Sequence, residues 1–396
     1  MSLSESIGVP RSDKGGEPLT PERTIATSSG DQHARLPGFT MTTPRGTLEA
    51  GGELHEVDRD ECLDVARELN SIVVGLLPFD PAEAPRLSVP EWFRWTPREQ
   101  GEENRIPLAR PTGTLGLDSR IFRDSVAAAV QRIHDGQLEK VVLSRALELH
   151  YDDEPLDTAA LYANLKTMNP SAYVFSVRDT STGEYIMGAS PELVVGVESG
   201  EVSTKPLAGS ASRAASDPTE DAQTGEALMR SAKDRAEHAT VVDDIAHRLK
   251  PITTELNVPA APSLVATPQL WHLGTYISGR LLPGLSALDA AQAVHPTPAI
   301  CGTPRNVALD VIRELEPSQR GFYGGLVGWT DPDGNGEWAL NLRSGRVGPR
   351  TVTLRAGAGI VNGSTPTGEH HETAVKLSTF LASLGLTLDD LNTLDQ

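Results

Sequence analysis

Six turn-forming residues, Asp331–Gly336 (DPDGNG), separate two segments of strand-like composition, Phe322–Trp329 and Glu337–Val347. Asp, Asn, Gly and Pro are the residues that tight hairpin loops require, so the stretch predicts two strands joined directly by a hairpin. A further strand-like segment, Thr351–Ile360, follows after another short loop. Connections this short favour antiparallel pairing, and they constrain the fold of the C-terminal part of the chain more than any other feature.

Elsewhere, segments with strand and helix patterns fall into separate blocks. Lys140–Leu149 alternates in the manner of a strand, with Lys140, Val142 and Ser144 on one face. Helical patterns are found at Ser119–Asp135, Pro218–Leu249 and Gly368–Leu384. Strands joined by hairpins and helices in separate blocks predict an α+β fold, a mixed α/β class with largely antiparallel sheets.

The chain is longer than most single domains, at 396 residues. Residues 1–37 are rich in Ser, Gly, Pro, Thr and charged residues, which predicts a disordered tail. No repeat or linker-like stretch follows residue 38. Residues 38–396 are therefore predicted to form one domain.

Charge excludes two classes of partner. The chain has 35 basic and 54 acidic residues and a net charge of −19, which is the wrong sign for a general nucleic-acid or anionic-membrane binder. Its two cysteines, Cys62 and Cys301, are too few for a disulfide framework. With no apolar signal segment and no run of membrane-spanning length, a cytoplasmic location is expected.

Two acidic pairs, Asp234-x-x-Glu237 and Glu369-x-x-Glu372, lie far apart within predicted helices. Residues three apart share a helical face, so each pair presents two carboxylates on one side. Either pair alone describes a solvated face, and Glu372 with Lys376 describes an ordinary ion pair. Four carboxylates meeting in one place would instead need a cation, and oxygen-only ligands suit Mg²⁺ better than Zn²⁺.

Lys140 and Glu192 are candidates for acid–base chemistry. A lysine at the start of a strand is usually an edge charge, but enclosure would favour its neutral form, which can act as a base. Glu192 precedes the apolar run Leu193–Val195, and burial beside such residues would raise its pKa and make it a proton donor. A base and an acid on opposite sides of a ring form a push–pull pair.

Nine motifs in a fixed order resemble those of the chorismate-utilising enzymes. This family includes the anthranilate, aminodeoxychorismate, salicylate and isochorismate synthases. The similarity runs from about Pro37 to Thr387, including Leu76–Pro81 (LLPFDP). The motifs are Lys140–Arg145 (KVVLSR), Gly188–Leu193 (GASPEL), Pro206–Ser210 (PLAGS), Lys233–His238 (KDRAEH), His295–Pro304 (HPTPAICGTP), Gly324–Trp329 (GGLVGW), Gly334–Trp338 (GNGEW), Arg355–Val361 (RAGAGIV) and Gly368–Leu377 (GEHHETAVKL).

The resemblance implies two packed antiparallel sheets with helices outside, an active site in a cleft, chorismate as substrate and a monomeric state. Ala208 stands where aminodeoxychorismate synthases carry a nucleophilic lysine, which argues against a covalent adduct. Lys140, which the anthranilate synthases lack, points to activated water. The sequences of the motifs from His295 to Trp338 are most similar to those of isochorismate synthases, particularly those that supply the synthesis of 2,3-dihydroxybenzoate siderophores.

By the same resemblance, Mg²⁺ is held by Glu237 and Glu372, with Asp234 and Glu369 in support, and it anchors the ring carboxylate of chorismate. Lys140 activates the water that attacks C2, and Glu192 protonates the hydroxyl that leaves C4. The implied substrate contacts are made by Arg343, Lys376, Gly357, Gly209, Ser210, Ala299 and Ile300. His295 either bonds near the leaving group or starts a loop before Pro296, and the sequence leaves both open.

Two alternative functions remain. Salicylate synthases share Lys140 and continue from isochorismate to eliminate pyruvate. A chorismate-binding paralogue without turnover is also possible, although mere binding needs no acid–base pair. Neither the siderophore nor the menaquinone pathway is singled out by the chemistry, because both start from the same product.

Overall fold

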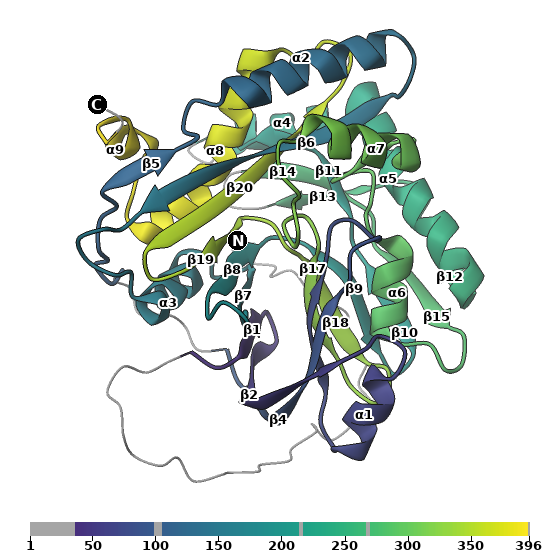
Figure 1. The fold of residues 1–396 in the computed structure, drawn as a ribbon. Helices are drawn as coiled ribbons and strands as arrows, with labels where there is room; N and C mark the ends of the chain where they lie inside the picture. Colours follow the sequence, from purple (N-terminus) through teal and green to yellow (C-terminus); the bar gives the residue numbers. More distant parts are fainter. Residues whose placement is uncertain (1–35, 99–104, 214–216, 267–269, 395–396) are drawn as a thin grey trace. The chain divides into compact units, whose positions relative to one another are not determined.

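The structure is a computed structural model, and it describes residues 36–98, 105–213, 217–266 and 270–394 (Figure 1). These residues all belong to one compact unit, His33–Gln396. The predicted N-terminal tail, residues 1–37, lies outside the described ranges except for Leu36 and Pro37, so it stays a prediction. Within these ranges, no helix combines the length and the apolar character that a membrane crossing requires.

Antiparallel strands dominate the described part of the chain. There, 17 strands join into one hydrogen-bonded sheet, and β11, β14 and β13 form a second sheet of three strands. The strands are β1 (Phe39–Thr43), β2 (Gly46–Val57), β3 (Val73–Leu77), β4 (Arg86–Thr96), β5 (Gly113–Leu115), β6 (Lys140–His150), β7 (Tyr173–Arg178), β8 (Tyr185–Ser190), β9 (Leu193–Glu198), β10 (Glu201–Thr204), β11 (Leu207–Ser212), β12 (Thr253–Asn257), β13 (Ser263–Ala266), β14 (Leu270–Gly274), β15 (Ile277–Leu281), β16 (Gly302–Thr303), β17 (Leu326–Thr330), β18 (Gly336–Leu340), β19 (Ser344–Val347) and β20 (Thr351–Ile360). The predicted mixed α/β class with antiparallel sheets is confirmed. Because β19 pairs with β20 on one side and β8 on the other, hydrogen bonds run continuously through the larger sheet.

Along the sequence, helices alternate with the blocks of strands. They are α1 (Cys62–Glu68), α2 (Arg120–His134), α3 (Thr158–Met168), α4 (Pro218–Arg230), α5 (Ala232–Leu249), α6 (Ala287–Val294), α7 (Arg305–Leu315), α8 (Pro366–Leu384), α9 (Leu388–Asn392) and the 3₁₀ helix η1 (Lys250–Ile252). The prediction of one continuous helix over Pro218–Leu249 is wrong, because the chain is extended at Ser231 (ψ 113°). The Ser231 side chain accepts a hydrogen bond from the Asp234 N–H and so caps a new helix, α5.

The predicted hairpin is confirmed. Strands β17 and β18 pair from Leu326↔Leu340 to Thr330↔Gly336. The Asp331 carboxylate accepts hydrogen bonds from the backbone N–H groups of Asp333 and Asn335, each at 2.9 Å, and this closes the turn.

The ladder between β6 and β20 positions the site. Its register places Val142 opposite Gly359 and Ser144 opposite Gly357. Figure 1 shows these two long strands side by side, and α2, α7 and α8 pack near them. Leu377 and Leu381, four apart on α8, are buried in the same core cluster as Leu354 of β20. This packing fixes which face of α8 turns away from the core.

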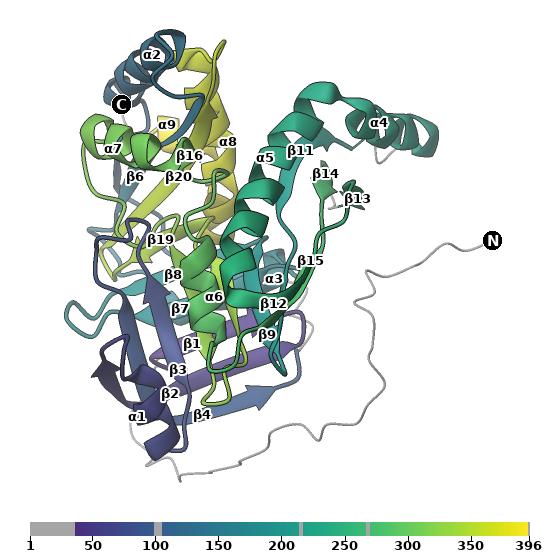
Figure 2. The same cartoon turned by 90° about the vertical axis from the view of Figure 1, so that its right-hand side faces the viewer.

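A second group of elements carries the other acidic pair. Helices α4 and α5 both pack on β11, the first strand of the smaller sheet. Figure 2 shows α4 and α5 alongside β11, β13 and β14. Through α5, this group brings Glu237 into contact with Lys140 of β6, and it places Asp234 against Gly209 of β11.

Candidate active site

Lys140 lies at the start of β6 and reaches α5. Its Nζ donates a hydrogen bond to Glu237 Oε1 at 2.9 Å, and the two side chains are 18% and 41% exposed. Gly359, on the neighbouring strand, leaves room for the lysine, since a Cβ there would lie 3.0 Å from Lys140 Cε. The candidate base and a candidate metal ligand are therefore in direct contact, although 97 positions separate them.

Glu192 lies in the turn before β9, and its backbone is held on both sides. Its N–H donates to Ser190 Oγ at 3.2 Å, and its carbonyl accepts from the Leu340 N–H at 3.0 Å. Burial raises the pKa of Glu192 to about 7, in the direction that the sequence predicts. No hydrogen bond or ion pair engages its carboxyl group in the parts of the chain that the structure covers. Glu192 can therefore hold a proton near neutral pH and is free to donate it.

The C-terminal acidic pair projects from the first turns of α8. Glu372 Oε1 accepts a hydrogen bond from Lys376 Nζ at 2.7 Å, and the same Nζ donates to the Gly357 carbonyl at 2.9 Å. Burial raises the pKa of Glu369, and one of its carboxyl oxygens, Oε2, is buried with no hydrogen-bond partner in the part of the chain that the structure describes. An unpaired buried oxygen is costly unless a ligand satisfies it.

Arg343 belongs to the same region. Burial lowers its pKa, and the nearby Tyr323 and Glu372 oppose this shift. Its backbone is left-handed, with φ +50°, a conformation that non-glycine residues rarely adopt. Strained backbone of this kind concentrates at ligand-binding sites, where the surrounding structure enforces it. Arg343 and Lys376 thus provide two cationic groups beside Glu372.

Asp234 contacts the other predicted substrate segment. Gly209 has φ +77° at an irregularity in the β11–β14 pairing, and a Cβ there would lie 3.1 Å from the Cβ of Asp234. The next residue, Ser210, makes a hydrogen bond from its Oγ to Nδ1 of His272 at 2.7 Å. Glycine at position 209 thus allows the backbone to approach α5 closely.

The structure does not gather all four predicted metal ligands into one cluster. Within the described ranges, no group of three or more His, Cys, Asp or Glu side chains is placed to hold a metal ion. Lys140 and Lys376 instead pair with Glu237 and Glu372, because each lysine offers the nearest compensating charge. The donor set still fits a hard cation: it is all carboxylate oxygen, and Glu369 Oε2 has no partner among the described residues.

The segment from His295 to Ile300 is buried except at Ala299, which is half-buried. Ile300 is 6% exposed, and Ala299 packs against the main hydrophobic core. His295 Nε2 donates to the Pro78 carbonyl at 3.1 Å, and burial lowers the pKa of His295 to about 3. Of the two roles left open for His295, the contacts fit the loop role, because a neutral ring anchored to a backbone carbonyl supports the segment.

Two side chains beside the predicted residues escaped the sequence interpretation. The Tyr323 hydroxyl would lie 3.5 Å from a Cβ at Gly357, and Tyr323 is close enough to Arg343 to affect its pKa. His272 contacts Ser210, as described above. Tyr323 directly precedes the Gly324–Trp329 motif, which was a usable signal, whereas nothing local marks His272.

Comparisons with known proteins show the family of the chain. A family model described as chorismate binding enzyme matches residues 96–385. Isochorismate synthase DhbC of Bacillus subtilis is 41% identical over 324 residues, which cover 80% of this chain and 81% of that protein. The crystal structure of a putative 2,3-dihydroxybenzoate-specific isochorismate synthase, DhbC from Bacillus anthracis, superposes with a TM-score of 0.80 at 36% identity, covering 88% of this chain and 96% of that one. The menaquinone-specific isochorismate synthase MenF of Escherichia coli superposes with a TM-score of 0.78 at 26% identity, covering 89% and 90%.

Proposed function

The chain belongs to the chorismate-binding enzyme family, and we propose that it is an isomerase that converts chorismate to isochorismate. The observation that carries the proposal is the contact between Lys140 and Glu237, which joins a candidate base to a candidate metal ligand at 2.9 Å. Its relatives named isochorismate synthase, which match most of its length, support the same reaction.

In the proposed reaction, Lys140 acts as the base and takes a proton from water while the water oxygen attacks C2 of chorismate. The ring double bonds shift and the C–O bond at C4 breaks. Glu192 gives its proton to the departing hydroxyl, which leaves as water. One water enters and one leaves, so the net change is an isomerisation. The pKa of about 7 at Glu192 supports its role as the acid, since about half of these groups carry a proton at neutral pH.

The cationic groups and the glycine-containing segments would orient the substrate. Arg343 and Lys376 would bind the two carboxylates of chorismate, because guanidinium and ammonium groups form strong charge-assisted hydrogen bonds with them. Gly357, Gly209 and Ser210 would make close contacts with the ligand. Ala299 and Ile300 would form the wall near the ring, and His295 would support that wall through Pro78.

Glu237 and Glu372, with Asp234 and Glu369 beside them, would hold Mg²⁺. The bound ion would anchor the ring carboxylate of chorismate and offset the negative charge around it. The partnerless Oε2 of Glu369 supports this assignment. Glu237 Oε1 already accepts from Lys140, so binding an ion through that oxygen would compete with the lysine.

The proposal also covers the location, the partners and the pathway of the enzyme. The buried free thiols of Cys62 and Cys301 suit a reducing compartment such as the cytoplasm. The net charge of −19 argues against nucleic acid or an anionic membrane as partner. The substrate is a small molecule, chorismate, and the family resemblance implies a monomer. The relatives named DhbC favour the 2,3-dihydroxybenzoate siderophore branch over the menaquinone branch.

The test is to incubate the full chain with chorismate and Mg²⁺ and to separate the products by liquid chromatography. Isochorismate as the only product supports the proposal. Salicylate together with pyruvate would instead identify a salicylate synthase. Binding of chorismate with no product would identify a non-catalytic paralogue, and either of these results overturns the proposal.

A further inference from the structure

Among the described residues, no strand pairs with part of one edge of β6. Along its other edge β6 pairs with β20, but on this edge it pairs with β16 only at Lys140 and Val141, and with β5 only from Glu148 onward. The Val142 N–H donates to the Cys301 carbonyl at 2.9 Å, but the Val142 carbonyl and the Ser144 N–H need partners that a strand does not supply. Buried N–H and C=O groups without partners would destabilise the sheet.

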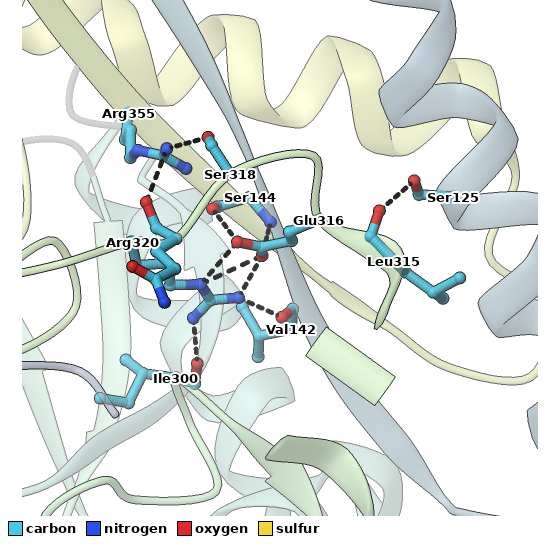
Figure 3. Close-up of polar contacts among 10 residues, drawn as sticks. Ser125, Val142, Ser144, Ile300, Leu315, Glu316, Ser318, Arg320 and Arg355 are labelled. Atoms are coloured by element: carbon cyan, nitrogen blue, oxygen red, sulfur yellow. Dashed lines mark hydrogen bonds and ion pairs between the residues drawn. The ribbon is translucent and has the colours of Figure 1, made fainter. Parts of the chain in front are cut away.

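An ion pair formed by Glu316 and Arg320 supplies these partners (Figure 3). The Glu316 carboxylate accepts from the Ser144 N–H at 2.7 Å and from Ser144 Oγ at 3.0 Å. Arg320 Nη2 donates to the Val142 carbonyl at 2.6 Å. Two side chains thus take the place of a strand immediately beyond Lys140.

The pair is almost fully enclosed. The Glu316 and Arg320 side chains are 4% and 3% exposed, and Arg320 Nε donates to both carboxylate oxygens of Glu316 at 3.0 Å. Desolvating two charges costs several kcal/mol, and apolar residues of similar size often fill such space at no loss of stability. Stability alone is therefore a weak reason for a charged pair at this position.

Arg320 also contacts two other segments that the sequence motifs include. Its Nη1 donates to the Ile300 carbonyl at 3.1 Å, and its guanidinium lies 4.0 Å from the centre of the Phe79 ring. Figure 3 shows Arg320 between Ile300 and Val142. One guanidinium therefore joins the strand of the base Lys140 to the wall segment of the ring pocket.

From this convergence we infer that Glu316 and Arg320 are positioning residues, which hold the Lys140 strand and the Ile300 wall at a fixed spacing across the substrate. The inference rests on the proposed function. Neither side chain takes part in the chemistry. The planar guanidinium donates hydrogen bonds to the Val142 carbonyl, the Ile300 carbonyl and the Glu316 carboxylate at the same time. The single ammonium group of a lysine cannot reproduce this arrangement.

The experiment compares Arg320→Lys with the wild type in the full chain. The fraction of folded protein is counted by chorismate-binding stoichiometry in a calorimeter, and kcat and KM are then measured per binding-competent molecule. A misplacement of about 1 Å can lower a rate by about 10²-fold. We expect kcat to fall by about that factor, with KM and the dissociation constant of chorismate within about threefold of the wild type.

Arg313→Lys is the matched control. Arg313 lies on α7, just before Glu316, and pairs with both carboxylate oxygens of Asp80 at 2.7 and 2.8 Å, next to Phe79. It does not contact β6 or Ile300 through any interaction in the described ranges. The kcat of the Arg313→Lys variant should therefore match that of the wild type.

If Arg320→Lys does not fold, Glu316→Gln tests the same prediction. The glutamine keeps the shape of the side chain and one acceptor oxygen for Ser144, so the variant should fold. It removes the negative charge that holds Arg320, so kcat should fall. A purely structural pair would lower the yield or the melting temperature and leave kcat per competent molecule unchanged, and that result overturns the inference. Failure of the proposed function is distinguishable, since the wild type itself would then not form isochorismate.

Discussion

Lys140 Nζ and Glu237 Oε1 lie 2.9 Å apart, and this hydrogen bond joins the first residue of β6 to the second turn of α5. The contact puts the amine next to a carboxylate that is itself a candidate metal ligand. The chemistry of the base and the binding of the cation are therefore expected to depend on each other. The predictions below test each side of that relationship.

Replacing Lys140 with alanine should remove nearly all turnover and leave substrate binding nearly intact. General base catalysis contributes about 10²- to 10⁴-fold, so kcat should fall by a factor in that range. Steady-state kinetics and calorimetry with chorismate measure the two effects. Lys233→Ala, an exposed lysine on the same helix as Glu237, is the control and should behave as the wild type. Near-normal activity in Lys140→Ala would remove the base assignment.

The pKa of about 7 at Glu192 predicts the alkaline limb of the pH profile. A general acid must be protonated, so kcat/KM should decline as pH rises through about 7. Glu192→Gln, which cannot donate a proton, should lose most of the activity and this limb with it. A wild-type profile that stays flat to about pH 9 would contradict the assignment.

Stability tests the same group without reference to activity. Because burial raises the folded-state pKa of Glu192 above its ordinary value, the folded state binds more protons than the unfolded state between those two pKa values. Wild-type stability should fall as pH rises through that window. Glu192→Gln should therefore melt higher than the wild type at about pH 8, with a smaller difference at about pH 5. An equal difference at both values would argue against a raised pKa.

Magnesium binding should depend on Glu237. We expect Glu237→Gln to weaken Mg²⁺ binding at least tenfold in a calorimetric titration, since an amide oxygen carries no charge. Lys140→Ala should bind Mg²⁺ more tightly than the wild type, because the lysine no longer competes for Glu237. Asp243→Asn, an exposed residue on the same helix, is the control. Unchanged affinity in Glu237→Gln would exclude Glu237 as a ligand.

Gly359 gives Lys140 its room. A methyl group at position 359 would meet Lys140 Cε at 3.0 Å, so Gly359→Ala should displace the amine and lower kcat by about 10- to 100-fold. The backbone at Gly359 is not left-handed, so the fold should tolerate the change. Gly113→Ala, where a Cβ would meet no atom within 4 Å, is the control. Equal activity in the two variants would mean that the position of Lys140 is not constrained.

The fold class and the hairpin at Asp331–Gly336 could be predicted because their signals are local: turn residues and alternation. The break at Ser231 was missed because a single capping serine interrupts an otherwise continuous helical pattern. Lys140 and Glu192 were identified mainly through resemblance. Their partners could not be predicted, since Lys140–Glu237 and Ser144–Glu316 are contacts across 97 and 172 positions. Tertiary pairings of this kind leave no local pattern in the sequence.

The most direct test of the central claim, that Lys140 activates a water molecule to attack C2, is the source of the new hydroxyl oxygen. The full chain is supplied with chorismate and Mg²⁺ in water enriched in ¹⁸O, and isochorismate is analysed by mass spectrometry and NMR. The proposed mechanism predicts one ¹⁸O atom in each product molecule, at the C2 hydroxyl. Isochorismate that carries only the original oxygen would contradict it, because the hydroxyl would then have moved from C4 to C2 without solvent.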